Sequence, residues 1–133
     1  MISDILYIAV VLIGFLFSGL YLFKKRCMNY HIQALDKEWD SIPKEVRVLC
    51  LALMRVAGGG FLAMSISISY LVFNKVHNSF EENLMILIIG LACLLPTLWA
   101  TLQVKKNTKG NPPVALCYIV VVLLFAGFLT SLL

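Results

Sequence analysis

Residues 84–104, LMILIIGLACLLPTLWATLQV, contain no charged side chain, and this stretch decides which kind of fold the sequence can form. An α-helix rises about 1.5 Å per residue, so roughly 20 apolar residues cross the hydrocarbon core of a bilayer. Three further uncharged stretches have similar lengths, at 5–23, 56–73 and 114–133. The sequence therefore predicts an all-α integral membrane protein with four spans.

The overall composition agrees with that prediction. Of the 133 residues, 61% are hydrophobic and 14% are charged, whereas a soluble domain has roughly 25% charged residues. The chain has too few polar residues to cover a soluble domain, and its length fits one domain. We predict a single transmembrane domain over 1–133, a four-helix bundle with spans at about 4–24, 46–74, 83–104 and 113–133.

The basic residues predict the orientation. Nine of the eleven follow spans one and three, namely Lys24, Lys25, Arg26, Lys37, Lys44, Arg47, Lys105, Lys106 and Lys109. Only Lys75 lies between spans two and three, and Arg55 belongs to the second helix. Because short loops rich in Lys and Arg stay in the cytoplasm, both termini are expected outside it. The same reasoning accounts for the net charge of +4, so we expect no nucleic-acid partner.

Residues 28–40, MNYHIQALDKEWD, differ from the rest of the chain because apolar and polar residues alternate at helical spacing. Such a pattern predicts a short amphipathic helix lying in the membrane interface, between helices one and two. Trp39 suits the interfacial depth. Pro43 is tolerated in a first helical turn, so the second long helix is expected to begin near Lys44 and to end at about Phe73.

The second span carries a run of small residues: Gly58, Gly59, Gly60, Ala63 and Ser67. In a membrane bundle, small residues at four-residue spacing let two helix backbones approach closely. We predict that the face formed by Gly59, Ala63 and Ser67 makes the tightest contact of the bundle. The first span carries a second candidate pair, Gly14 and Ser18.

Local signals also mark the third and fourth long helices. Ser79 and Glu82 have the spacing of a capping box, which predicts a helix start there. Pro96 removes one backbone hydrogen bond and predicts a kink in the third span. Cys93, Thr97 and Thr101 form a mildly polar line that is expected to face other helices. Pro112 or Pro113 is expected to open the last helix.

Arg55 is the most informative candidate for a binding site, because a charge placed at the bilayer centre costs about 2.5–3.5 kcal/mol. One interpretation is an anchor that reaches the headgroups. The other is a shaped site at the cytoplasmic mouth, in which Arg55 and Lys105 meet Tyr30, His31 and Trp39. Its ligand would be an anionic amphiphile, a lipid or a quinone, since a guanidinium binds carboxylate or phosphate in bidentate fashion.

The sequence carries no sign of a catalytic or metal centre. The uncharged stretches 5–23, 84–104 and 114–133 contain no acidic, basic or histidine side chain, and no catalytic motif is present. The cysteines, Cys27, Cys50, Cys93 and Cys117, lack metal-ligand spacing. His31 and His77 lie on opposite sides in the predicted topology, so one chain cannot bring both to one metal. We therefore expect no cofactor, no metal and no catalytic residue.

Two functions stay open at this point. The first is a non-enzymatic accessory or assembly bundle that interacts with membrane lipids, either as a homo-oligomer or within a larger membrane complex. The second is a ligand-binding protein, transporter or enzyme whose site lies at the cytoplasmic mouth around Arg55.

Three segments carry a resemblance to a known group of proteins: 30–34 with Trp39, 53–60, and 104–108 before Pro112. In these segments the chain resembles small four-span membrane proteins of bacteria that have no characterised activity. The resemblance implies a four-helix fold in a bacterial inner membrane, and it implies no function.

Overall fold

The structure, a computed structural model, describes residues 2–74 and 79–133, and these residues are helical throughout apart from their connections. The elements in chain order are α1 (Ile2–Phe23), α2 (Asn29–Leu35), the 3-10 turn η1 (Trp39–Ser41), α3 (Lys44–Phe73), α4 (Phe80–Asn107) and α5 (Val114–Ser131). Lys75 and His77, which entered the charge and metal arguments, lie outside the described residues.

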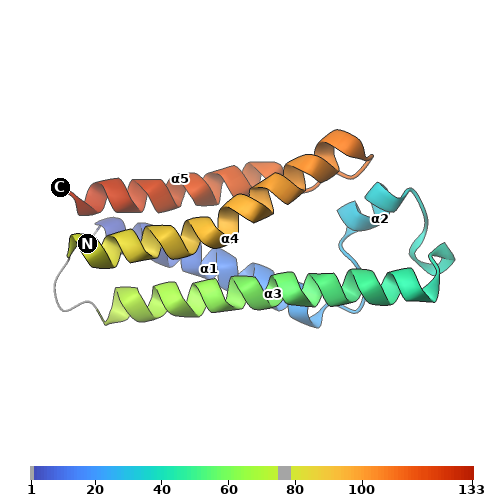
Figure 1. Cartoon of the computed structure of the whole chain (residues 1–133), viewed down its shortest axis with the longest axis horizontal. Helices are drawn as coiled ribbons and strands as arrows, with labels where there is room; N and C mark the ends of the chain where they lie inside the picture. Colours follow the sequence, from blue (N-terminus) through green and yellow to red (C-terminus); the bar gives the residue numbers. More distant parts are fainter. Residues whose placement is uncertain (1, 75–78) are drawn as a thin grey trace.

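The axes of the four long helices are aligned, and both chain termini lie at one end of the bundle with α2 at the other (Figure 1). α1 packs against α3 and α5, and α4 packs against α5 and α3. Each of the four is long and apolar enough to cross a membrane. The all-α prediction and the four long apolar helices are thereby confirmed. Their shared core is built from Tyr7, Val10, Ile68, Ile86 and Leu124.

The predicted helix boundaries of α3 are confirmed, since it begins at Lys44 and ends at Phe73. α4 extends beyond the predicted 83–104 at both ends. Its start at Phe80 confirms the helix start predicted from the capping box: the Glu82 N–H donates to Ser79 Oγ at 3.2 Å, and the Ser79 N–H donates to the Glu82 carboxylate at 3.4 Å. Pro96 lies inside α4, which changes direction part-way along its length (Figure 1).

The predicted helix over 28–40 is wrong in length. α2 ends at Leu35 because Asp36 adopts a left-handed conformation, with φ 52° and ψ 39°. Aspartate tolerates this conformation better than most residues, and the Asp36 N–H donates to the Gln33 carbonyl as the helix closes. The chain then forms η1 before Pro43 introduces α3. The interfacial placement of α2 stays a prediction.

Glycines make the close contacts between the helices, and two of them, Gly14 and Gly58, lie between α1 and α3. A Cβ on Gly58 would lie 2.9 Å from Tyr21 and 3.2 Å from the Leu22 backbone nitrogen, both in α1. A Cβ on Gly14 would collide with the Ser65 side chain of α3. Ser18 is buried as well, so the predicted close-approach pair Gly14 and Ser18 is confirmed.

The predicted contact face of α3 is wrong by one position. A Cβ on Gly59 or Gly60 would meet nothing within 4 Å, and Ala63 is exposed. The buried face of α3 instead includes Gly58, Phe61 and Ser65. Neighbouring helical residues are rotated by about 100° from one another, which follows from 3.6 residues per turn. In a run of three consecutive glycines, the sequence therefore does not determine which one faces the neighbouring helix.

We predict opposite results for two adjacent substitutions in α3. Gly58→Ala places its methyl group against the backbone of α1 and should destabilise the protein by about 1–3 kcal/mol. Gly59→Ala meets open space and improves helix propensity, so stability should be unchanged or higher. Thermal unfolding of both purified variants in mild detergent measures the difference. An equal loss of stability in the two variants would refute the assigned contact face.

Candidate functional site

An apolar cavity lies between α1, α3, α4 and α5, in the half of the bundle nearest α2. It contains about 500 Å³ of space between atoms, including the part open to the surroundings. The apolar part of its wall includes Ile13, Phe17, Phe61, Met64, Leu94 and Val120. Thr97, Thr101 and Cys117 add the few polar atoms. We call this space the inner cavity.

The bend of α4 gives this cavity its position. Leu94, Thr97 and Thr101 line the cavity and lie on both sides of Pro96. Beyond the bend, α4 diverges from α3 toward the α2 end (Figure 1). The proline therefore separates the helices where the cavity lies, and the predicted polar line of α4 faces other helices at Thr97 and Thr101.

Tyr21 of α1 and Tyr30 of α2 lie at the α2 end of the inner cavity. Both residues line it, and their two hydroxyl groups are hydrogen-bonded to each other. The Tyr21 ring also packs edge-on against Phe61, with ring centroids 5.8 Å apart. Burial raises the pKa of the Tyr30 hydroxyl above its ordinary value. The two tyrosines therefore remain neutral at physiological pH.

A second space, which we call the outer groove, lies on the other side of Tyr21. It has a volume of about 640 Å³, again including its open part, and its walls come from α1, α2 and α3. His31, Cys50, Leu53 and Met54 are among its lining residues. Tyr21 lines both spaces, so its ring forms the partition between them.

His31 is an uncharged residue in this setting. Its ring lies 6.4 Å from that of Tyr21, and its Nδ1 atom is buried without a hydrogen-bond partner. Burial lowers the pKa of His31 below its usual 6.5. A histidine with a lowered pKa is neutral at pH 7, so it adds no positive charge to the groove.

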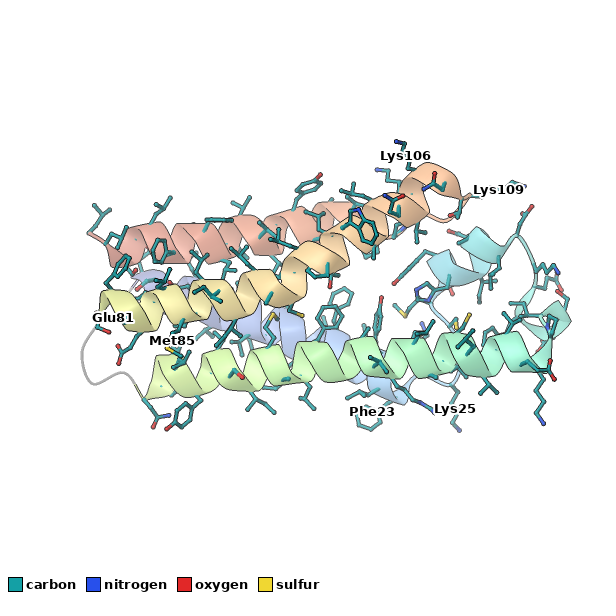
Figure 2. The ribbon with its side chains drawn as sticks, viewed as in Figure 1. Phe23, Lys25, Glu81, Met85, Lys106 and Lys109 are labelled. Carbon is teal, nitrogen blue, oxygen red and sulfur yellow. The ribbon has the colours of Figure 1, made fainter. Side chains whose placement is uncertain are left out.

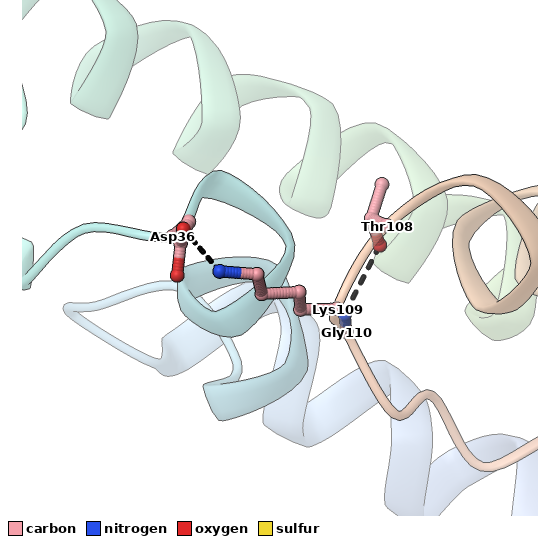
Figure 3. A network of polar contacts seen from close by, with 4 residues as sticks. All are labelled: Asp36, Thr108, Lys109 and Gly110. Carbon is pink, nitrogen blue, oxygen red and sulfur yellow. Dashed lines mark hydrogen bonds and ion pairs between the residues drawn. The ribbon is translucent and has the colours of Figure 1, made fainter.

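The loop between α4 and α5 holds α2 in place. Lys109 Nζ donates to Asp36 Oδ2 at 2.6 Å, and the Gly110 N–H donates to Thr108 Oγ1 at 3.1 Å (Figure 3). A Cβ on Gly110 would lie 2.6 Å from the Tyr30 carbonyl oxygen. Because both partners of the ion pair are exposed, it contributes at most about 1 kcal/mol. The close approach of Gly110 is the tighter restraint on α2.

No protein-family model, curated protein or solved structure matches this chain. The candidate site therefore has to be interpreted from its own residues, and the resemblance to four-span bacterial proteins stays an expectation.

The structure brings only part of the predicted site together. Tyr30 lines the inner cavity and His31 lines the outer groove. Arg55 and Lys105 are exposed and line neither space. Trp39 instead lies near Arg47, whose guanidinium carbon is 5.9 Å from the indole ring centre. The pocket predicted from all five residues is not assembled, because the charged side chains turn outward.

Two residues near the site were not singled out as site residues from the sequence. Tyr21 is an aromatic residue in an apolar span, and Cys117 is a small apolar-like residue in another. Neither differs in pattern from an ordinary core residue. Of the two tyrosines, only Tyr30 can be recognised as a candidate from the sequence, because it lies in a separate, more polar segment. No pattern in the sequence therefore identified the partition.

Cys27, in the connection from α1 to α2, is almost completely buried, with 1% of its surface exposed. Burial and the neighbouring Cys50 raise the pKa of the Cys27 thiol to about 11. A thiol with this pKa is protonated at neutral pH and reacts slowly. In the described residues, no group of three metal-ligating side chains is found.

We predict that Gly110→Val releases α2 from the bundle. The added side chain would overlap the Tyr30 carbonyl oxygen and displace the helix. Hydrogen exchange of the 29–35 amides should then become much faster, while the amides of α3 remain protected. Lys109→Ala is the matched control in the same loop, since it removes only an exposed ion pair and should change exchange little. Unchanged exchange in Gly110→Val would contradict the assigned anchor.

Proposed function

We propose that this chain is an integral membrane protein that crosses the bilayer with α1, α3, α4 and α5. Large apolar side chains on the outside of the bundle support this proposal: Leu12 is 63% exposed, Val56 74%, Trp99 67% and Val122 64%. Contiguous apolar surface of this extent is unfavourable in water and is expected where lipid covers it.

The orientation follows from the charges at the two ends of the bundle. Lys25, Lys106 and Lys109 lie at the α2 end, whereas Glu81 lies near the termini (Figure 2). By the positive-inside rule we assign the α2 end to the cytoplasm and both termini to the outside. A bacterial inner membrane is the membrane that the resemblance favours.

This orientation predicts the sidedness of thiol labelling. In a background with the native cysteines replaced, Lys25→Cys should react with an impermeant maleimide only from the cytoplasmic side. Glu81→Cys should react only from outside, and both positions are exposed. Cys27 is unsuitable as the reporter because its thiol is buried and protonated. Labelling of the two variants from the opposite sides would overturn the orientation.

Within the membrane, we propose that the protein holds a small lipophilic molecule between its helices. The observation that carries this proposal is the inner cavity, to which all four long helices and Tyr30 of α2 contribute. Concave, mainly apolar spaces with a few polar groups are typical of small-molecule sites. The anionic ligand expected at Arg55 has less support, since Arg55 is exposed.

Filling the inner cavity tests the binding proposal. Cys117→Phe places a ring in the cavity, whereas Ala115→Phe adds a ring to the same helix on its exposed side. Native mass spectrometry from mild detergent should detect a co-purified lipophilic molecule on the wild type and on Ala115→Phe. The amount bound to Cys117→Phe should fall at least tenfold. Equal retention by all three proteins would contradict a site in this cavity.

An accessory or assembly role is the second candidate. The observation in its favour is the outward position of Gly59, Gly60 and Ala63, which leaves a small-residue surface on α3 free within one chain. Membrane helices associate through such surfaces. Gly59→Leu would then change the oligomeric state in detergent while leaving the inner cavity intact.

A further inference from the structure

We propose that the molecule held in the inner cavity is electrically neutral and carries a single hydrogen-bonding oxygen, as a hydroxyl or a carbonyl, at the tyrosine end. This inference rests on the proposed binding function and specifies the class of ligand. Alcohols and ketones with a short chain or a single ring belong to this class. Fatty acids and phosphorylated lipids do not.

The first argument is the absence of charge from the cavity wall. None of the fourteen residues that line the inner cavity is charged, and they include five polar side chains in all: Tyr21, Tyr30, Thr97, Thr101 and Cys117. An ionised carboxylate taken from water into such a wall loses several kcal/mol of hydration without a partner. A neutral head avoids this penalty, so the wall selects against anions.

The second argument is that the outer groove contains no positive charge that could bind an anionic ligand. His31 is the one ionisable base among the eight residues that line the groove. It packs against the tyrosine rings, and no acidic side chain lines either space to favour its charged form. The basic residues of this end, including Arg55 and Lys105, are exposed. An anionic head therefore has no cation to bind in either space.

The third argument is the number of hydrogen-bond donors that remain available. Thr97 Oγ1 donates to the Cys93 carbonyl at 2.8 Å, and Thr101 Oγ1 donates to the Leu98 carbonyl at 2.9 Å. Their hydrogens are therefore already used. The bonded pair of Tyr21 and Tyr30 has two hydroxyl hydrogens and uses one between them. The other is available, so the tyrosine end can donate one hydrogen bond to a ligand oxygen. The Cys117 thiol, which accepts from Thr101 Oγ1 at 3.9 Å, is only a weak donor.

The shape of the cavity limits the rest of the molecule. Ile13 and Tyr21 both line it, and eight residues of α-helix correspond to about 12 Å along the axis of α1. This length is an upper limit, so at most a short chain or a single ring can lie next to the tyrosines. It does not accommodate a complete diacyl lipid, which would have to leave part of its chains outside the bundle.

Two photoreactive probes test the inference on the purified full-length protein. Both carry the same saturated chain with a diazirine, and one ends in an alcohol while the other ends in a carboxylate. After irradiation, peptide mass spectrometry locates the adducts. For each probe, adducts at Thr97, Thr101 and Cys117 are divided by those at the exposed positions Tyr118 and Val122. This ratio corrects for unequal partitioning of the probes into the detergent.

The alcohol should give a ratio at least ten times that of the carboxylate at pH 7.5. The double variant Tyr21→Phe/Tyr30→Phe, which removes both hydroxyl hydrogens, should lower the ratio for the alcohol by about 2- to 10-fold, the effect of one lost hydrogen bond. A matched probe without a polar head should be unaffected by this double substitution. Counted at Thr97 and Thr101 alone, the ratio should fall for every probe in Cys117→Phe, whereas it should not in Ala115→Phe.

The outcomes separate the inference from the function on which it rests. If the carboxylate labels the inner positions as strongly as the alcohol, the neutral ligand class is wrong, while the binding site stands. If no probe labels the inner positions above the exposed ones, the proposed binding function itself fails. An unchanged alcohol ratio in the double variant Tyr21→Phe/Tyr30→Phe would overturn the assignment of the hydrogen bond to the tyrosine end.

Discussion

The close approach of α1 and α3 at two glycines is the constraint on which the rest of the site depends. Between helices surrounded by lipid, association depends on van der Waals packing, because leaving the lipid gives little hydrophobic gain. Gly14 and Gly58 allow the two backbones to approach. Gly58 lies against Tyr21, so the same contact that joins the helices also positions the partition between the two spaces. A larger residue at Gly58 would therefore disturb the fold and the candidate site together.

The architecture was predictable because it depends on signals that are local in the sequence. The uncharged stretches determine four long helices, and the Ser79–Glu82 capping box determines where one of them begins. The length of α2 was not predictable from periodicity, because the apolar spacing continues to Trp39 while Asp36 turns the backbone out of the helix. The prediction of the contact face of α3 was wrong for a related reason. Consecutive glycines have no side chain by which the sequence can indicate which of them faces a neighbour.

The candidate site was predictable only at α2. Tyr30 and His31 stand out because they are aromatic or ionisable residues outside the spans, and they do line the two spaces. Arg55 and Lys105 stood out for their charge, but a long basic side chain is most stable where its charged end reaches water or headgroups. The positive charge that makes these two residues stand out in the sequence therefore also keeps them out of the cavities. Tyr21 does not stand out in the sequence, yet it lines both spaces.

The stability of α2 determines whether Tyr30 stays at the wall of the inner cavity. A seven-residue helix is too short to be stable alone in water, where isolated helices need about 12–15 residues. No residue of α2 is fully buried, so its helical form depends on the bonds it makes with other elements. These are the tyrosine pair on one side and the Gly110 loop on the other. Loss of either contact removes support from the helix that carries Tyr30. Folding of α2 and the position of Tyr30 at the wall of the inner cavity are therefore linked.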